Sequence, residues 1–162
     1  GTDPFIRLSN LLSEPIFNVL KEQDPHSIAR VLPISGDITL PGLGINEDDL
    51  QLLRENVSVV IHAAATVRFD EPLEVALNIN LGGTSRLLDL AETMHQIQAV
   101  VYVSTAFSNC ERSFIDEKVY PVMIDPKGAL TLHSTFRPEF LQRILPEILQ
   151  TKPNTYTLTK HL

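Results

Sequence analysis

The sequence predicts an α/β domain whose sheet is mostly parallel. Short β-branched runs alternate along the chain with longer helical patterns, which is typical of this class. The runs are nearly continuous in apolar residues, as expected for strands covered on both faces. The chain of 162 residues is 43% hydrophobic and 20% charged, which suits one globular domain.

Three apolar runs are predicted as strands and four segments as helices. The strands cover residues 30–35, with Pro33 as a local irregularity, residues 57–63 and residues 99–104. The helices run from an N-cap at Asn46 to about Glu55, from an N-cap at Asp70 with Pro72 in its first turn, from Pro138 to about Leu149, and from about Lys152 onward. Residues 105–137 read as one long irregular stretch, and a loop of this length is usually functional.

The second helix carries an apolar stripe and two glycines. Gly82 and Gly83 should each cost about 1 kcal/mol relative to Ala inside a helix. We interpret this cost as a sign that another backbone or a ligand approaches the helix closely. The spacing of three and four residues predicts one face that holds Leu77, Leu81, Thr84, Leu88 and Ala91.

Charge and composition exclude several classes of function. The 20 acidic and 13 basic residues give a formal net charge of −7, which disfavours nucleic-acid binding because phosphate contacts need clustered Lys and Arg. The single Cys110 excludes an internal disulfide. No apolar run reaches the roughly 18 residues that a membrane helix needs, so no span is predicted in this chain.

Neither end of the chain resembles a natural boundary. There is no initiator Met, and the helix that contains Tyr156 shows no stop signal before Leu162. We therefore expect residues 1–162 to form a single domain that is truncated at both ends.

Tyr156 and Lys160 form the first candidate catalytic pair. Their spacing places the phenol and the ammonium on one face of a helix. A phenol has a pKa of about 10, and a neighbouring cation lowers that pKa because it stabilises the phenolate. Tyr156 can then donate a proton to a carbonyl oxygen as hydride reaches the carbon. An exposed helix pair gives the same spacing and is the alternative interpretation.

Further candidates stand at the ends of predicted strands, where ligands bind in open parallel sheets. The hydroxyls of Ser104 and Thr105 can polarise a substrate carbonyl, or alternatively satisfy the N–H groups of a turn. The three alanines at 63–65 would let a cofactor approach the backbone closely. We interpret His62, just before them, as a packed and hydrogen-bonded histidine rather than a catalytic residue or metal ligand.

Two polar residues outside the strand ends also need an explanation. Asn does not favour helices, so Asn80 beside the glycine pair suggests a buried amide that holds a water or fixes the helix. Asp37, in the run Gly36-Asp37-Ile38, can accept a hydrogen bond from an adenine amino group. The alternative for Asp37 is a turn residue that follows a strand.

In their order and spacing, these motifs resemble the extended short-chain dehydrogenase/reductase family, and more narrowly its alcohol-forming fatty acyl-CoA reductases. The likeness covers the chain from about Arg7 onward. Its carriers are Ala-Ala-Ala-Thr-Val-Arg-Phe-Asp-Glu at 63–71, Tyr-Val-Ser-Thr-Ala-Phe-Ser-Asn-Cys at 102–110 and Pro-Asn-Thr-Tyr-Thr-Leu-Thr-Lys at 153–160, with support from residues 33–38 and 117–120.

That family binds NADPH on a Rossmann-type fold and reduces long-chain fatty acyl-CoA to a fatty alcohol in two hydride transfers. The resemblance implies a partial Rossmann-type, doubly wound parallel sheet in this chain. It also implies that Tyr156 donates the proton and that Lys160 lowers the pKa of Tyr156 and bonds the nicotinamide ribose. Ser104 or Thr105 would hold the carbonyl oxygen, and Asn80 would support the site. The cofactor contacts that it implies, besides Tyr156 and Lys160, are Asp37, Ile38, Ala63, Ala64 and Ala65.

The chain departs from the family at its start. It contains no Gly-x-x-Gly-x-x-Gly turn, which cradles the pyrophosphate in family members, and the strand before that turn is missing as well. Without that strand the others lose their neighbours, so we expect the chain alone to be inactive and poorly folded. For the intact enzyme, the resemblance implies association with peroxisomal or endoplasmic-reticulum membranes.

Three alternatives stay open. Another enzyme of the extended family, such as a sugar-nucleotide epimerase or a reductase of carrier-bound acyl chains, would use the same catalytic residues. Cys110 could act as a nucleophile that forms a thioester, for which His133 and Arg112 are the available base and cation. The chain could also be a truncated product without activity that binds a partner through exposed strand edges.

Overall fold

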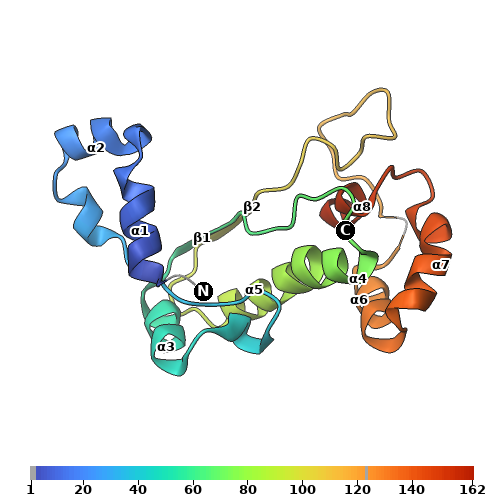
Figure 1. Cartoon of the computed structure of the whole chain (residues 1–162), viewed down its shortest axis with the longest axis horizontal. Coiled ribbons are helices and arrows are strands. Elements are labelled where there is room, and N and C mark those ends of the chain that lie inside the picture. Colours follow the sequence, from blue (N-terminus) through green and yellow to red (C-terminus); the bar gives the residue numbers. More distant parts are fainter. Residues whose placement is uncertain (1–2, 123) are drawn as a thin grey trace.

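The computed structural model describes residues 3–122 and 124–162, and Figure 1 shows how they are arranged. Two strands lie among helices and short helical turns. In chain order the elements are α1 (Pro4–Ser13), η1 (Pro15–Phe17), α2 (Asn18–Gln23), η2 (Ser27–Arg30), η3 (Pro41–Gly44), α3 (Glu47–Asn56), β1 (Val59–His62), α4 (Leu73–Ala76), the π-helical η4 (Leu77–Gly82), α5 (Gly83–Glu92), β2 (Ala99–Tyr102), α6 (Pro126–Thr135), α7 (Pro138–Leu149) and α8 (Thr155–His161).

β1 and β2 pair in parallel, with Val59 opposite Ala99 and His62 opposite Tyr102. The continuous helical segment α4–η4–α5 connects them. Parallel neighbours need a crossover of this kind, so the segment from β1 to β2 is a strand–helix–strand unit. The predicted α/β class with a parallel sheet is confirmed, and both strands lie inside the predicted ranges 57–63 and 99–104.

Helices cover one face of the two strands. Val60 packs into a cluster with Leu50 of α3 and Leu90 of α5, and Figure 1 shows both helices on the same side of the sheet. On the opposite face, Ile61 is 70% exposed and Val101 48% exposed. The described residues therefore supply one of the two helical layers that a doubly wound sheet carries.

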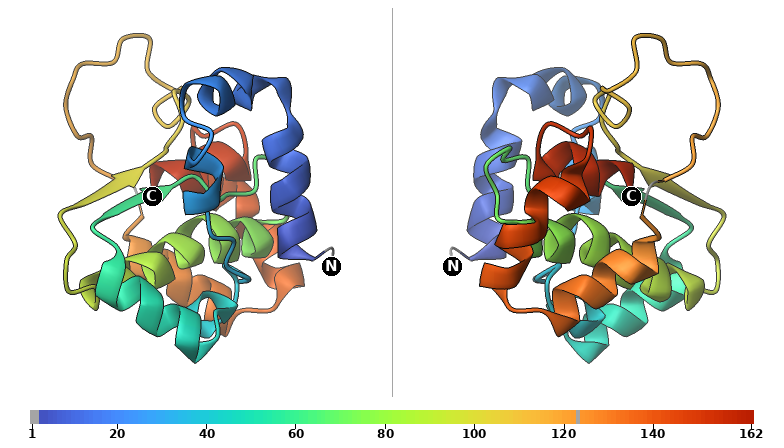
Figure 2. Two further views of the ribbon diagram at one scale, coloured as in Figure 1. Left: turned by 90° about the vertical axis from the view of Figure 1, so that its left-hand side faces the viewer. Right: turned by 90° about the vertical axis from the view of Figure 1, so that its right-hand side faces the viewer.

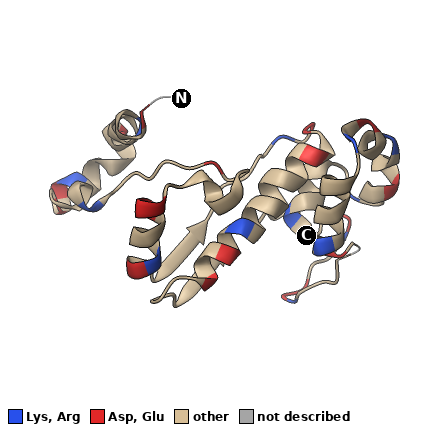
Figure 3. Ribbon diagram, turned by 90° about the horizontal axis from the view of Figure 1, so that it is seen from below, with Lys and Arg blue, Asp and Glu red and all other residues tan. Residues whose placement is uncertain are grey.

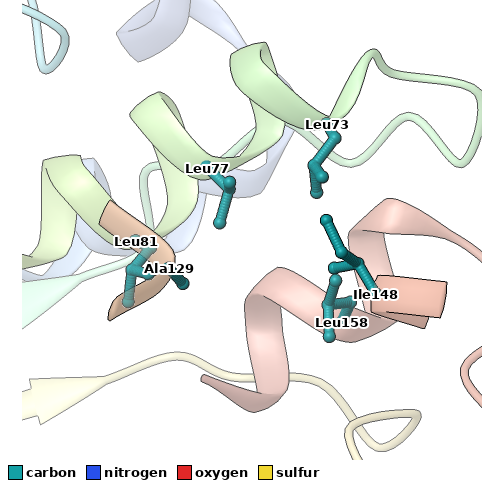
Figure 4. Packing of buried hydrophobic residues seen from close by; sticks show 6 residues of the cluster. All are labelled: Leu73, Leu77, Leu81, Ala129, Ile148 and Leu158. Carbon is teal, nitrogen blue, oxygen red and sulfur yellow. The ribbon is translucent and has the colours of Figure 1, made fainter. Parts of the chain in front are cut away.

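The helix α4–η4–α5 contributes to two separate cores. Its first half packs against α6, α7 and α8, as Figure 4 shows for Leu73, Leu77, Leu81, Ala129, Ile148 and Leu158. Its second half packs against α3 and the sheet. A π-helical turn adds a residue to one turn, so residues after η4 are rotated relative to those before it. In the predicted stripe Leu77, Leu81 and Ala91 are buried, but Leu88 is 44% exposed.

The glycine pair explains a close contact. A Cβ at Gly83 would lie 2.5 Å from Cγ1 of Ile38, so only glycine lets that side chain rest on the helix. At Gly82 a Cβ would meet the Arg86 guanidinium at 3.1 Å. This guanidinium donates to the Ile38 carbonyl oxygen (2.9 Å) and to both oxygens of Asn78 (2.8 Å). The expectation that another segment approaches is confirmed for Gly83, where that segment is represented by Ile38; the neighbour of Gly82 is Arg86 of the same helical segment.

α3 forms where the sequence predicted it. The Asn46 side chain accepts a hydrogen bond from the Asp49 backbone N–H at 3.0 Å, and acidic residues fill the first turn while Arg54 lies in the last. Both placements suit the helix dipole. Figure 3 shows these charges on α3, and it shows Lys and Arg distributed over several elements. Among the described residues, no helix has the length and apolarity needed to cross a membrane.

Three of the predicted elements need correction. The strand predicted at residues 30–35 does not form: Arg30 ends η2, and residues 31–35 have no regular structure. Pro33 cannot donate to a ladder, and the described residues supply no neighbouring strand to pair with this segment. Asp70 does not cap a helix, because α4 begins at Leu73 with Pro72 as its N-cap. The stretch 105–137 contains α6, whose start is marked by Asp125 accepting from the Gly128 N–H at 2.9 Å. The sequence Asp125-Pro126 carried that signal.

The N-terminal helices stand apart from the rest. α1, η1 and α2 contain no buried residue, and Phe5, Ile16 and Val19 are each more than half exposed. Figures 1 and 3 show these helices as an arm that extends away from the sheet, and Figure 2 gives the two side views. We call residues 4–23 the N-terminal arm.

Candidate active site

α8 carries the candidate pair of Tyr156 and Lys160. The helix begins where the Asn154 side chain accepts a hydrogen bond from the Thr157 N–H at 2.9 Å. The predicted helix is confirmed, and it starts slightly later than expected. The Tyr156 phenol is half-buried, and its ring packs against Phe69 with a centroid distance of 5.4 Å. Lys160 is buried.

The ammonium of Lys160 lies at the carboxyl end of β2. Its Nζ donates to the Val103 carbonyl oxygen at 2.7 Å and lies 4.2 Å from the centre of the Tyr102 ring. Burial lowers the pKa of Lys160, and the nearby Tyr156 phenol opposes that shift. The cation is thus fixed beside the phenol by a carbonyl and an aromatic face.

Ser104 and Thr105 follow directly and differ in their contacts. The Ser104 hydroxyl donates to the backbone carbonyl of Lys160 at 3.3 Å, so it meets α8. The Thr105 hydroxyl accepts from the Phe107 N–H at 3.2 Å, which is a turn contact. The structure therefore brings Ser104 to the Tyr156–Lys160 helix, and it leaves the proton of the Thr105 hydroxyl available for another acceptor.

The Asn80 side chain connects three segments. It is 2% exposed, and its Oδ1 accepts from the Thr66 N–H at 2.9 Å. Its Nδ2 donates to the Thr66 carbonyl at 3.2 Å and to the Thr159 hydroxyl at 2.9 Å. The amide therefore ties η4 to the segment after β1 and to α8, next to Lys160.

His62 lies in the same polar layer. Its Nε2 is 3.0 Å from the Thr84 hydroxyl, which itself donates to the Asn80 carbonyl at 2.6 Å. Because a hydroxyl has one proton to give, Nε2 is the donor in the contact with Thr84. Burial lowers the pKa of His62, and the positive charge of Lys160 lowers it further. The geometry matches the interpretation as a packed, hydrogen-bonded histidine.

The candidate cofactor residues fall into two groups. Ala63 and Ala64 are exposed and Ala65 is half-buried. They leave β1 at the edge where Val103 leaves β2, since His62 and Tyr102 are in register. Ile38 lies instead against Gly83 of α5, and Asp37 lies beside Gly44. The Asp37 carboxylate accepts from the Thr39 hydroxyl (2.6 Å) and N–H (2.8 Å), and these bonds lower its pKa.

Several contacts that organise the site had no sequence signal. The Thr155 hydroxyl donates to the Glu71 carbonyl at 2.8 Å, and the Thr66 hydroxyl donates to the Glu71 carboxylate at 2.7 Å. Lys152 is buried beside the loop that follows β2. The alternation of threonines at 155, 157 and 159 was visible, but their partners are distant in sequence.

The geometry gives the Cys110 alternative no support. The thiol is exposed. The Arg112 guanidinium lies over the Tyr120 ring at 4.1 Å. His133 lines a hollow with Gly82, Ser85 and Arg86 on the side of η4 and α5. Both suggested partners of the thiol thus contact other groups.

The chain thus forms an α/β unit of two parallel strands and a crossover helix, with the Tyr156–Lys160 helix at the carboxyl edge where such sheets bind ligands. The chain belongs to the NAD-binding domain family described as "Male sterility protein", which matches residues 1–162. This membership assigns a nicotinamide cofactor to the domain.

Curated relatives sharpen the family assignment. The chain is 40% identical over 162 residues to "Fatty acyl-CoA reductase wat" of Drosophila melanogaster. The aligned region covers 100% of this chain and 31% of the relative. It is 36% identical over 162 residues to "Fatty acyl-CoA reductase 1" of Xenopus laevis (100% and 32%) and 33% identical to the Homo sapiens protein of the same name (100% and 32%). The chain thus spans about a third of their length. The predicted resemblance to fatty acyl-CoA reductases is confirmed.

Proposed function

We propose that the full-length protein containing this chain reduces long-chain fatty acyl-CoA to the fatty alcohol with NADPH. The names of its relatives support the substrate class. One structural observation carries the proposal: α8 holds the Tyr156 phenol and the Lys160 ammonium at the carboxyl edge of β2, where Nζ lies 2.7 Å from the Val103 oxygen and Ser104 meets the helix.

Each residue of the site has its own role in the proposed reduction. A bound nicotinamide supplies hydride to the carbonyl carbon. Tyr156 donates the proton that the carbonyl oxygen takes up, and Lys160 favours the phenolate that remains. Ser104 or Thr105 donates a hydrogen bond to the same oxygen. Asn80 keeps α8 in place through Thr159.

Two rounds of reduction account for the product. In the first, the carbon–sulfur bond of the thioester breaks and CoA leaves as the thiol, which gives the aldehyde. In the second, the aldehyde becomes the alcohol. Each round consumes one hydride and one proton, so Tyr156 must be reprotonated between rounds.

The residues present fit the nicotinamide end of the cofactor. Exposed Ala63 and Ala64 leave the backbone at the end of β1 accessible, and the Lys160 ammonium lies at the neighbouring strand end. For the adenine end we propose Asp37 and Ile38, of which Ile38 lies against Gly83 of α5. The 162 residues contain no Gly-x-x-Gly-x-x-Gly motif for the pyrophosphate.

The test is NADPH oxidation with palmitoyl-CoA, measured for the full-length protein and for residues 1–162 alone. We expect turnover by the full-length protein and none by the chain, since the exposed sheet face at Ile61 and Val101 lacks cover. If the full-length protein folds and binds NADPH but leaves palmitoyl-CoA unchanged, the result would indicate a different substrate, either a sugar nucleotide or a carrier-bound acyl chain. We place the intact enzyme at peroxisomal or endoplasmic-reticulum membranes.

A further inference from the structure

Lys152 is a buried lysine in the turn between α7 and α8. Its side chain is 1% exposed, and Nζ donates to the Glu111 carboxylate at 2.7 Å and to the Ser108 carbonyl oxygen. Burying an ammonium costs free energy unless charged or polar partners replace its water. A lysine retained in such a place therefore has a specific contact to make.

The contact joins the turn that leads into α8 to the loop that carries the candidate hydroxyls. Residues 104–111 leave β2 and fold through successive turns, with Ser108 N–H donating to the Thr105 carbonyl at 3.2 Å and Cys110 N–H to the Phe107 carbonyl at 3.2 Å. These turns transmit the position of Ser108 back to Thr105. A shift at the Lys152 end of the loop would therefore displace the hydroxyls.

The loop is attached on both sides of Tyr156, to α8 after it and to the turn that leads into α8 before it. Four residues after the phenol, Lys160 holds the Val103 carbonyl and accepts from Ser104. Four residues before it, Lys152 holds Ser108 and Glu111. Two points of attachment fix both the distance and the orientation between the phenol and the loop, whereas one would leave the loop free to swing.

Both partners are anchored and charged. The Lys152 backbone N–H donates to the Leu149 carbonyl at 2.8 Å, which fixes the turn. Burial raises the pKa of Glu111, but the hydrogen bond from Lys152 and the charges of Lys152 and His161 outweigh it and leave that pKa below its ordinary value. The Glu111 carboxyl therefore stays ionised at neutral pH and can accept from the Lys152 side chain.

We propose that Lys152 is a positioning residue that sets the loop with Ser104 and Thr105 against Tyr156, so that hydroxyl and phenol meet one carbonyl oxygen. The inference rests on the proposed function for its catalytic consequence. Lys152 acts through the loop and does not itself contact the substrate or the cofactor.

The experiment compares Lys152→Met and Lys152→Arg in the full-length protein, with Lys127→Met as control. Lys127 lies exposed on α6, so its loss removes a charge without removing the contact. For Lys152→Met we expect kcat for palmitoyl-CoA to fall about 10- to 100-fold, the scale of a misplaced catalytic group. We expect the Kd for NADPH to change by less than about twofold, since a misplaced loop hydroxyl affects the reacting carbonyl and not the proposed cofactor contacts. Lys152→Arg should lose less, because it keeps the charge.

Amide hydrogen exchange of residues 104–111 gives a readout independent of the substrate. In Lys152→Met this segment should exchange at least about tenfold faster, while α5 stays unchanged. Glu111→Gln, at a more exposed position, should also speed exchange of residues 104–111, but by a smaller factor. This variant replaces Lys152→Met in the test if Lys152→Met fails to fold. Unchanged exchange and kcat in these variants, or a uniform loss of NADPH binding and exchange protection, would overturn the proposal. If the unsubstituted protein does not reduce palmitoyl-CoA, the proposed function fails while the exchange data still decide the role of Lys152.

Discussion

α1 and α8 are short helices with similar starts and opposite environments. Asp3 caps α1 by accepting from the Phe5 N–H at 2.8 Å, and Asn154 caps α8 by accepting from the Thr157 N–H at 2.9 Å. None of the ten residues of α1 is buried, although Phe5 and Leu11 are among them. Five of the seven residues of α8 are buried, and four of these five are polar.

The difference shows that partners elsewhere in the chain, and not apolar residues in the helix alone, decide which helix is fixed in place: Leu158 of α8 lies in the core, and the polar residues of α8 find hydrogen-bond partners. α8 can bury polar residues because each has a partner: Thr159 accepts from the Asn80 amide, and Lys160 donates to the Val103 carbonyl. The other two buried threonines donate to backbone carbonyls, Thr155 to Glu71 and Thr157 to Asn154. α1 has apolar residues, but none of its residues is buried. Substitutions in α8 should therefore reduce activity, and substitutions in the N-terminal arm should leave the site intact.

The largest expected effect is catalytic. Tyr156→Phe in the full-length protein removes the proton donor and keeps the ring that packs on Phe69. We expect kcat to fall by about 10² to 10⁴, the scale of general acid catalysis, with an unchanged melting temperature. The matched change Phe5→Leu on α1 should leave kcat as it is. Near-normal turnover by Tyr156→Phe would remove Tyr156 from the mechanism.

The next effect is on the attachment of α8. Asn80→Ala deletes the bonds to Thr66 and Thr159 and leaves buried polar groups unpaired. The free energy of local opening of α8, from native-state amide exchange, should fall by about 2–4 kcal/mol. The arm should exchange at its normal rate. An equal change in both regions would mean that Asn80 supports the whole fold and not this helix.

The two caps give a matched pair with a smaller effect. Asn154→Ala should lower the free energy of opening of α8 by about 1 kcal/mol. It should also lower the melting temperature of the protein. Asp3→Ala should lower the free energy of opening of α1 by a similar amount, seen as faster amide exchange. It should leave the melting temperature unchanged, because α1 contains no buried residue. If Asp3→Ala lowers the melting temperature as much as Asn154→Ala, the arm is part of the cooperative unit.

The smallest effect is a pH dependence from His62. Its pKa is lowered in the folded state by burial and by Lys160, so the unfolded chain binds the proton more readily. The contribution of His62 is therefore fully present above its unfolded pKa of about 6.5 and is lost as pH falls below that value, by at most about 1.4 kcal/mol per pH unit. Thermal unfolding at pH 7.5 and 5.5 should show this slope, and His62→Gln should flatten it. Replacement of the exposed His95 should not.

Local patterns in the sequence predicted much of this arrangement. The strands around Val60 and Val101, the cap at Asn46 and the pairing of Tyr156 with Lys160 on one helix all depend on neighbouring residues. The strand at 30–35 was wrong because strand formation depends on a partner elsewhere in the chain. The same limit applies to the site: Asn80 could be suspected, but its bonds to Thr66 and Thr159 span 14 and 79 residues.

Buried charge shows the limit most clearly. Lys152 and Lys160 are both buried, but only Lys160 stands in a motif that predicts its role. The partner of Lys152, Glu111, is 41 residues away in a loop without regular structure. Such a pair becomes visible only when the loop and α8 are seen together.

The most direct test of the central claim is the product itself. Full-length protein incubated with palmitoyl-CoA and NADPH should form hexadecanol, and the NADPH oxidised should equal twice the alcohol formed. The same reaction with Tyr156→Phe should form hexadecanol at a rate lower by about 10² or more while NADPH still binds. Formation of hexadecanol at equal rates by both proteins would contradict the claim that α8 carries the chemistry, and its absence from both would contradict the proposed reaction.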